Sequence, residues 1–163
     1  PLTGYDLTKA FDDEIGEFWQ AQHSQIYPQL KRLEEQGYVT HEITVSGEKL
    51  EKKLYHITAT GRQLLHEWIS VGTPDLTATK DEFILKLYFI QTDRDPRLLA
   101  MLQEQLTLHT AKLAHLQQRL ATVFPQAKAA KQHYGHYLIL QHAIGREDYY
   151  VNWLKQTLKA LPE

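Results

Sequence analysis

Hydrogen-bond donors and a cation gather on one face of a predicted helix. Ser24, Tyr27 and Lys31 fall together at the helical period of about 100° per residue, and Gln25 lies next to them. Their hydroxyl, amide and ammonium groups are of the types that contact the phosphates and base edges of duplex DNA. A later segment adds three lysines, which are Lys49, Lys52 and Lys53. We therefore expect an interface for double-stranded DNA.

Few side chains of this chain could act as nucleophiles or metal ligands. The sequence has no cysteine and only three serines, and it contains neither a nucleophile elbow nor a phosphate-binding loop. His133 and His136 have the spacing of one helix face, but the sequence offers no third ligand near them, so a structural role is favoured. We expect no enzyme activity, no catalytic residue, no cofactor and no metal site.

Two predicted helices position the first group of residues. The first runs from Thr3 to about Ile15, and Thr3 and Asp6 have the spacing of a capping box. The second runs from Ser24 to Gly37, with Pro28 expected in its first turn. The second helix has an apolar stripe on the side opposite the donors, formed by Ile26, Leu30 and Leu33.

A predicted hairpin holds the lysines. Residues 39–45 alternate between apolar and polar side chains, and residues 53–58 form the returning strand after a polar turn at Ser46-Gly47. Helix resumes over 59–70. The order of helix, helix, hairpin and helix predicts a winged helix-turn-helix domain over residues 1–72, in which the second helix enters the major groove.

The charge of this region opposes strong non-specific binding. Residues 1–69 contain seven Lys or Arg residues against eleven Asp or Glu residues, which is a net charge of −4. Bulk attraction to phosphates is therefore weak. A polar surface helix without a role in DNA binding remains the alternative to a recognition helix.

The second half, residues 76–163, is predicted to be all helical. Two long segments carry apolar residues at alternating steps of three and four, with one polar residue in each seam. The first seam comprises Leu99, Leu102, Leu106, His109, Leu113, Leu116, Leu120 and Val123. The second comprises Tyr137, Leu140, Ile144, Glu147, Val151, Leu154, Leu158 and Leu161. An internal hairpin explains both seams, but we favour coiled-coil-like seams that a second subunit shares, which would make this half a dimerisation domain.

The composition of the 163 residues is that of a globular chain. Apolar residues make up 42% and charged residues 23%, and the net charge is −2. No stretch approaches the roughly 18 apolar residues of a membrane span. We expect a mainly α, cytoplasmic protein without membrane contact.

Four short segments of the sequence form specific motifs. They are LTGYDL at 2–7, SQIYPQLKRL at 24–33, KLYHIT at 53–58 and KDEF at 80–83. These runs resemble the PadR family of transcriptional regulators over nearly the whole chain. The resemblance implies a homodimer that represses transcription from a palindromic operator, and it implies a helix ahead of the first run, so further residues are expected before Pro1.

Three further runs resemble the branch of this family that represses phenolic acid decarboxylase genes. They are LEKK at 50–53, GHYL at 135–138 and YVNWL at 150–154. The resemblance implies that a small phenolic acid, such as p-coumarate, releases the operator. We expect the acid to bind between the winged helix and the C-terminal helices, where aromatic and polar groups concentrate. The candidate effector residues are His136, Tyr137, Tyr149, Tyr150, Trp153 and Phe89, with His136 the first choice.

Two other interpretations stay open. One is a repressor of the same family that responds to a different small hydrophobic ligand. The other is an adaptor, in which the winged helix binds only protein.

Overall fold

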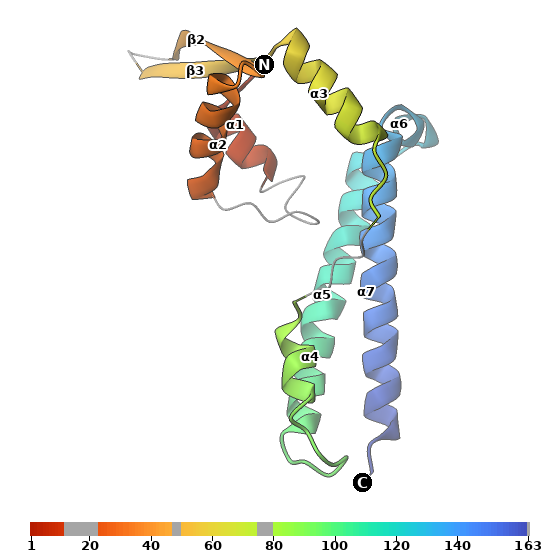
Figure 1. Cartoon of the computed structure of the whole chain (residues 1–163). Helices are drawn as coiled ribbons and strands as arrows, with labels where there is room; N and C mark the ends of the chain where they lie inside the picture. Colours follow the sequence, from red (N-terminus) through yellow and green to blue (C-terminus); the bar gives the residue numbers. More distant parts are fainter. Residues whose placement is uncertain (12–22, 47–49, 75–79, 163) are drawn as a thin grey trace. The chain divides into compact units, whose positions relative to one another are not determined.

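The computed structural model describes residues 1–11, 23–46, 50–74 and 80–162 (Figure 1). The chain divides into an N-terminal unit, Pro1–Thr77, and a C-terminal unit, Ala78–Glu163. The first contains a small sheet with helices, and the second consists of helices alone.

The first helix begins at a complete capping box. α1 (Gly4–Ala10) follows the short strand β1 (Leu2–Thr3). The backbone N–H of Asp6 donates to the Thr3 hydroxyl at 3.1 Å, and the backbone N–H of Thr3 donates to the Asp6 carboxylate at 3.0 Å. Both side chains thus satisfy amides that a helix start leaves without partners. The predicted capping box is confirmed, whereas the predicted extension to Ile15 falls outside the described residues.

α2 (His23–Glu35) buries the apolar stripe that its sequence predicts. Ile26 and Leu30 are each 7% exposed. Pro28 lies inside the helix and not in its first turn, because the helix has already begun at His23. The helix is followed by Gly37, whose φ of 76° lies in the left-handed region that favours glycine.

The predicted hairpin is confirmed as a wing. β2 (Val39–Ser46) pairs antiparallel with β3 (Leu50–Ile57), and β1 pairs with the other edge of β3. The Glu34 carboxylate on α2 bonds to Nδ1 of His41 on β2. This bond ties the second helix to the sheet, so the wing and the exposed face of α2 have one defined arrangement.

α3 (Ala59–Ser70) completes the order that a winged helix requires. The Thr58 hydroxyl caps it by accepting from the N–H of Gly61 at 3.0 Å. A Cβ atom at Gly61 would lie 2.1 Å from the carbonyl oxygen of Tyr38. Glycine is therefore required here by the close approach of α3 to the start of β2.

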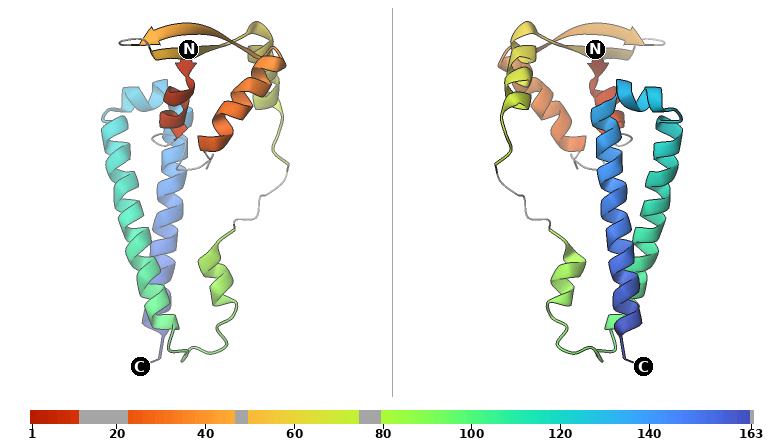
Figure 2. Two further views of the ribbon diagram at one scale, coloured as in Figure 1. Left: turned by 90° about the vertical axis from the view of Figure 1, so that its left-hand side faces the viewer. Right: turned by 90° about the vertical axis from the view of Figure 1, so that its right-hand side faces the viewer.

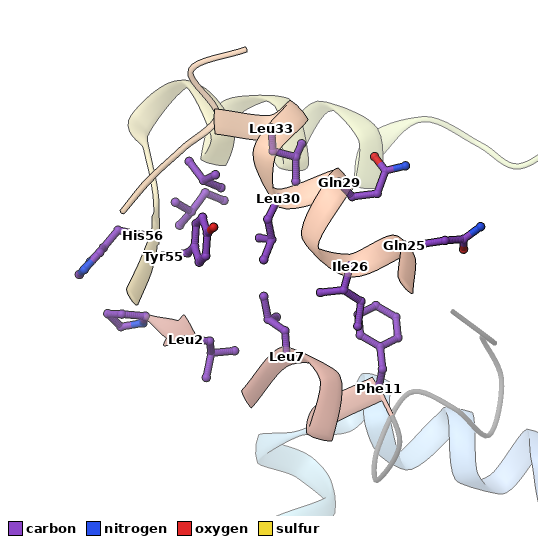
Figure 3. Close-up of a pocket in the computed structure, with 13 residues that line it drawn as sticks. Leu2, Leu7, Phe11, Gln25, Ile26, Gln29, Leu30, Leu33, Tyr55 and His56 are labelled. Carbon is purple, nitrogen blue, oxygen red and sulfur yellow. The ribbon is translucent and has the colours of Figure 1, made fainter. Parts of the chain in front are cut away.

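An apolar cavity of about 700 Å³ lies between α1, α2 and β3 (Figure 3). Leu2, Leu7 and Leu30 point toward one another across it, and Gln25 and Gln29 stand at its rim. The described residues therefore pack the interior of the N-terminal unit incompletely.

The C-terminal unit is a helical hairpin with a short helix against it. α5 (Leu98–Val123) and α7 (Tyr134–Ala160) lie side by side and antiparallel, and α6 (Ala127–Gln132) forms the turn between them (Figures 1 and 2). α4 (Glu82–Leu87) packs through Phe83. Among the described helices, none is long and apolar enough to cross a membrane.

The two heptad seams face each other within one chain. Leu102 and Leu116 of α5 are 0% exposed, and Leu140 and Leu154 of α7 are 2% and 0% exposed. For these leucines the internal hairpin is the correct alternative and the favoured prediction of a shared seam is wrong, whereas Leu99 and Val123 of the first seam stay 50% and 38% exposed. A short connection lets each seam find its partner in the same chain at a low entropic cost of loop closure.

The polar residues of the two seams pair with each other. Nδ1 of His109 lies 2.5 Å from Oε2 of Glu147, which is buried, and Arg146 donates to Oε1 at 3.2 Å. The His109 ring stacks on Tyr150 with 3.9 Å between centroids. Any other register would leave the Glu147 carboxylate without His109, so the pair favours the observed alignment of α5 and α7.

Candidate nucleic-acid interface

A surface hollow of about 540 Å³ brings together three elements of the N-terminal unit. The start of α1 contributes Gly4 and Tyr5, α2 contributes Tyr27, and β3 contributes Lys52 and Lys53. Three residues predicted to contact DNA thus lie around one hollow, although Tyr27 and Lys52 are 25 positions apart in the sequence.

The outward face of α2 is open to solvent. Ser24, Gln25 and Tyr27 are exposed, with 56% of Tyr27 accessible, but Gln25 lies at the rim of the apolar cavity and does not line the hollow. Lys31 is exposed as well, and its ammonium lies 3.8 Å from the carboxylate of Glu35 on the next turn. At this exposure the ion pair holds Lys31 weakly, so a phosphate can replace Glu35 as its partner.

The wing presents the lysines of β3 beside this face. Lys52 is half-buried opposite Thr44, and Lys53 is exposed opposite Ile43. The predicted contact of Lys49 lies outside the described residues. Tyr55, further along β3, also lines the hollow, and burial raises the pKa of its phenol.

Acidic groups near the hollow are partly engaged. The hydroxyl and backbone N–H of Thr3 hydrogen-bond to the Asp6 carboxylate and lower its pKa. Asp6 therefore stays charged, and one of its oxygens, Oδ2, accepts both donors of the capping box. Glu51 lines the hollow as an opposing charge to Lys52 and Lys53.

Sequence reasoning missed Tyr5 as a functional candidate. It is 64% exposed, it lines the same hollow as Tyr27, and its hydroxyl forms no hydrogen bond with the described part of the chain. Helical periodicity could not reveal it, because its partners come from other elements. The signal available in the sequence was an aromatic residue in the first turn of the first predicted helix.

The candidate effector residues do not form one site within a chain. His136 and Tyr150 are fourteen positions apart on α7, which is about 21 Å along a helix. That distance exceeds the length of a small phenolic acid. Tyr149 is 73% exposed and Phe89 is 66% exposed. The prediction that one ligand contacts all six residues is therefore wrong within one chain. The rise of α7 places His136 too far from Tyr150 for a single small ligand to touch both.

Tyr150 and Trp153 belong to the packed interior. The Tyr150 hydroxyl donates to Asp81 at 3.0 Å, and burial, followed by Asp81, raises the pKa of Tyr150. Trp153 packs edge-on against Tyr150 and Phe83, with ring centroids 5.4 and 6.4 Å apart. These contacts hold α4 against α7.

His136 and Tyr137 form a separate group at the other end of α7. Both rings contact Phe124 edge-on, with centroids 5.3 and 5.7 Å apart. Nε2 of His136 is buried and has no hydrogen-bond partner in the described part of the chain. Tyr137 and Phe124 also line a hollow of about 510 Å³, and His136 is not among the described residues that line it. An orphaned donor or acceptor among aromatic rings suits a small aromatic ligand with polar ends.

The histidines and acids of the described ranges form no cluster of three or more that could hold a metal ion. His133 is exposed and His136 is turned toward Phe124. The chemistry that the described side chains support is therefore binding by hydrogen bonds, charge and apolar contact.

Two protein families match successive parts of the chain. Residues 1–67 match the transcriptional regulator PadR-like family, and residues 79–162 match the virulence activator alpha C-term family. The negative transcriptional regulator PadR of Bacillus subtilis (strain 168) is 42% identical over 161 residues, which cover 96% of this chain and 88% of the relative.

Solved structures show the same fold over nearly the whole chain. Bacillus subtilis PadR in complex with operator DNA aligns with a TM-score of 0.88 and 40% identity, covering 99% of this chain and 91% of the other. The complex of the same protein with p-coumaric acid gives 0.80 and 38%, with the same coverage. The Vibrio cholerae virulence activator AphA gives 0.73 and 32%, covering 98% and 89%.

Proposed function

Because this chain belongs to the PadR-like family of transcriptional regulators, we propose that it represses a phenolic acid stress response gene. In this proposal a homodimer binds a palindromic operator, and a phenolic acid such as p-coumarate releases it. The N-terminal unit is the DNA-binding domain and the C-terminal unit is the dimerisation domain. The regulated gene encodes a phenolic acid decarboxylase.

The hollow between α2 and the wing is the observation that carries DNA binding. It places Tyr27 beside Lys52 and Lys53, so that a recognition helix and a wing can contact one duplex together. Ser24, Gln25 and Lys31 of α2, together with Lys49, complete the proposed set of DNA contacts. The net negative charge of this region makes the interaction depend on local contacts, and binding to unrelated DNA is weak.

The homodimer requires an apolar surface other than the α5–α7 seam. Large apolar side chains are exposed on α4 and directly after it: Leu85 is 61%, Tyr88 is 83% and Phe89 is 66% exposed. Such a patch is typical of a protein interface. A two-fold axis through the dimer would place the recognition helices about 34 Å apart, one turn of duplex DNA.

His136 is the first candidate for effector binding. Its buried Nε2 lacks a partner among the described residues, and Phe124 and Tyr137 supply aromatic walls. The imidazole can bind either the carboxylate or the phenol of the ligand. Release of DNA requires that the ligand prefer a domain arrangement with misplaced recognition helices. A hundredfold loss of DNA affinity corresponds to about 2.7 kcal/mol of coupling.

Salt-dependent binding of single-lysine variants tests DNA recognition. Lys31→Ala, Lys52→Ala and Lys53→Ala should each weaken operator binding roughly tenfold at low salt, since each removes a charged hydrogen bond. Each should also reduce the slope of log K against log salt by about 0.9 per lost phosphate contact. Lys155→Ala, on the exposed side of α7, is the matched control. Wild-type affinity and slope in all three variants would contradict the proposed interface.

Calorimetry with p-coumarate tests the effector. We expect heat of binding and loss of the operator complex in a gel shift, and we expect His136→Ala to abolish both responses. His142→Ala, an exposed histidine on the same helix, serves as the control. If millimolar p-coumarate gives no heat and does not change the gel shift, the proposed effector is wrong. The chain would then be a repressor that responds to a different small hydrophobic molecule. A chain that retards no duplex at low salt would be an adaptor.

A further inference from the structure

Tyr5 is an exposed aromatic residue of the DNA-facing hollow to which the proposed function assigns no role. It lies in the first turn of α1, and in helix-turn-helix domains the first helix of the motif crosses the DNA backbone. Its hydroxyl and that of Tyr27 form no hydrogen bonds with the described residues, although both rings border the same hollow. The hydroxyls of Tyr5 and Tyr27 are therefore two hydrogen-bond donors that lie beside the wing without a partner among the described residues.

The backbone of Gly4 holds the ring of Tyr27 in place. A Cβ atom at position 4 would lie 2.5 Å from Cε1 and 2.9 Å from Cζ of Tyr27. The ring therefore lies directly on the Gly4 backbone, while 56% of the Tyr27 side chain stays exposed. Glycine is needed for this close approach, and any side chain would push the ring away.

The charges around the hollow suit one anionic group. Lys52 and Lys53 supply two cations, and Glu51 supplies one anion. Asp6, whose Oδ2 accepts from the backbone N–H and the hydroxyl of Thr3, is a second anion that attracts Lys52. A phosphate gains from the lysines by charge and from the two tyrosines by hydrogen bonds, whereas a base edge gains little from ammonium groups alone.

We propose that Tyr5 contacts the operator and, together with Tyr27 and Lys52, binds a single backbone phosphate, and that Gly4 is a positioning residue that acts through Tyr27. This inference rests on the proposed DNA binding and adds to it a second contact element, the start of α1. The contact is to the backbone, so it contributes affinity without sequence preference.

Fluorescence anisotropy with two duplexes tests the Tyr5 contact. One duplex is the operator bound by the Bacillus subtilis relative, and the other is its scrambled sequence. Tyr5→Phe removes only the hydroxyl, so affinity for both duplexes should fall by the same factor of about ten. The salt slope should stay at the wild-type value, because no cation is lost, whereas Lys52→Ala should lower it.

Tyr134→Phe is the matched control, since Tyr134 is a tyrosine of the C-terminal unit that is 58% exposed and lies outside the proposed dimer surface. Wild-type affinity in Tyr5→Phe would overturn the contact. If Tyr5→Phe loses affinity for the operator but not for the scrambled duplex, Tyr5 contacts a base and not a phosphate. If the wild-type chain does not prefer the operator to the scrambled duplex, the proposed function fails, and that result is distinct from either outcome.

A double-mutant cycle tests the role of Gly4. Gly4→Ala should weaken operator binding in the wild-type background and have no further effect in the Tyr27→Ala background, because the added Cβ then meets no ring. Alanine favours the helix over glycine, so Gly4→Ala should not lose helical stability. Gly145→Ala is the control, since nothing lies within 4 Å of a Cβ there. Equal losses in both backgrounds would overturn the positioning role.

Discussion

The pair of His109 and Glu147 offers a sharp test of how the α5–α7 hairpin is held together. Glu147 is 5% exposed, and its two carboxylate oxygens contact His109 and the half-exposed Arg146. Replacing His109 by leucine leaves a buried carboxylate with Arg146 as its remaining partner. Breaking a buried pair in this way costs about 3–5 kcal/mol, and Arg146 should keep the loss near the lower end.

The reverse replacement should cost less. Glu147→Leu leaves Nδ1 of His109 without its partner, but the His109 side chain is only partly buried and keeps its stacking on Tyr150. Its expected cost is about 1–2 kcal/mol, as for an unsatisfied polar group. The double variant with two leucines restores an apolar seam of similar volume, so its stability should lie close to that of the wild type. The two single effects are therefore strongly non-additive.

Urea unfolding followed by circular dichroism measures these differences, since α5 and α7 contain much of the helix. With a slope of about 2 kcal/mol per molar urea, His109→Leu should lower the midpoint by roughly 1.5 M. Leu108→Ala, at an exposed position one residue away, is the control. Single effects that simply add in the double variant would refute the reasoning, because they would mean that the two residues act independently.

Two further predictions concern single contacts. Tyr150→Phe removes the hydroxyl that donates to Asp81 and should cost about 1 kcal/mol in urea unfolding. The pKa of Tyr150 is raised above its ordinary value of 10.0, so the wild type should lose stability as the pH rises above about 10, and this loss should be smaller in Tyr150→Phe, which keeps only the contribution of Tyr55. Gly61→Ala should cost about 2–3 kcal/mol because its Cβ meets the backbone oxygen of Tyr38, whereas Gly72→Ala should have no such cost; equal stability of the two variants would contradict the steric argument.

Local patterns in the sequence were sufficient to predict the individual helices and strands. The capping box at Thr3, the apolar stripe of α2 and the alternation of the wing each depend on neighbours within a few residues. Hydrogen-bonding geometry repeats at fixed intervals, so such spacing indicates a helix or strand directly. The winged helix and the all-helical second half therefore follow from residue spacing alone.

The partner of each seam could not be predicted from spacing. A heptad pattern shows that a helix has an apolar face, but it does not show whether the covering helix belongs to the same chain. The structure decides this by placing Leu102 against Leu154 within one hairpin. It also pairs His109 with Glu147, which the sequence shows only as two separate polar interruptions.

Which residues come together at a binding site likewise depends on the tertiary structure. Residue types alone suggested that Tyr137 and Tyr150 share a ligand, but the axial rise of α7 separates them. In the opposite sense, Gly4 and Tyr27 are distant in sequence, and only the packing of α1 on α2 reveals their contact. Sequence determines which groups each element carries, because that depends on local geometry. The set of groups that meets one ligand depends on how elements pack, and packing is a property of the whole fold.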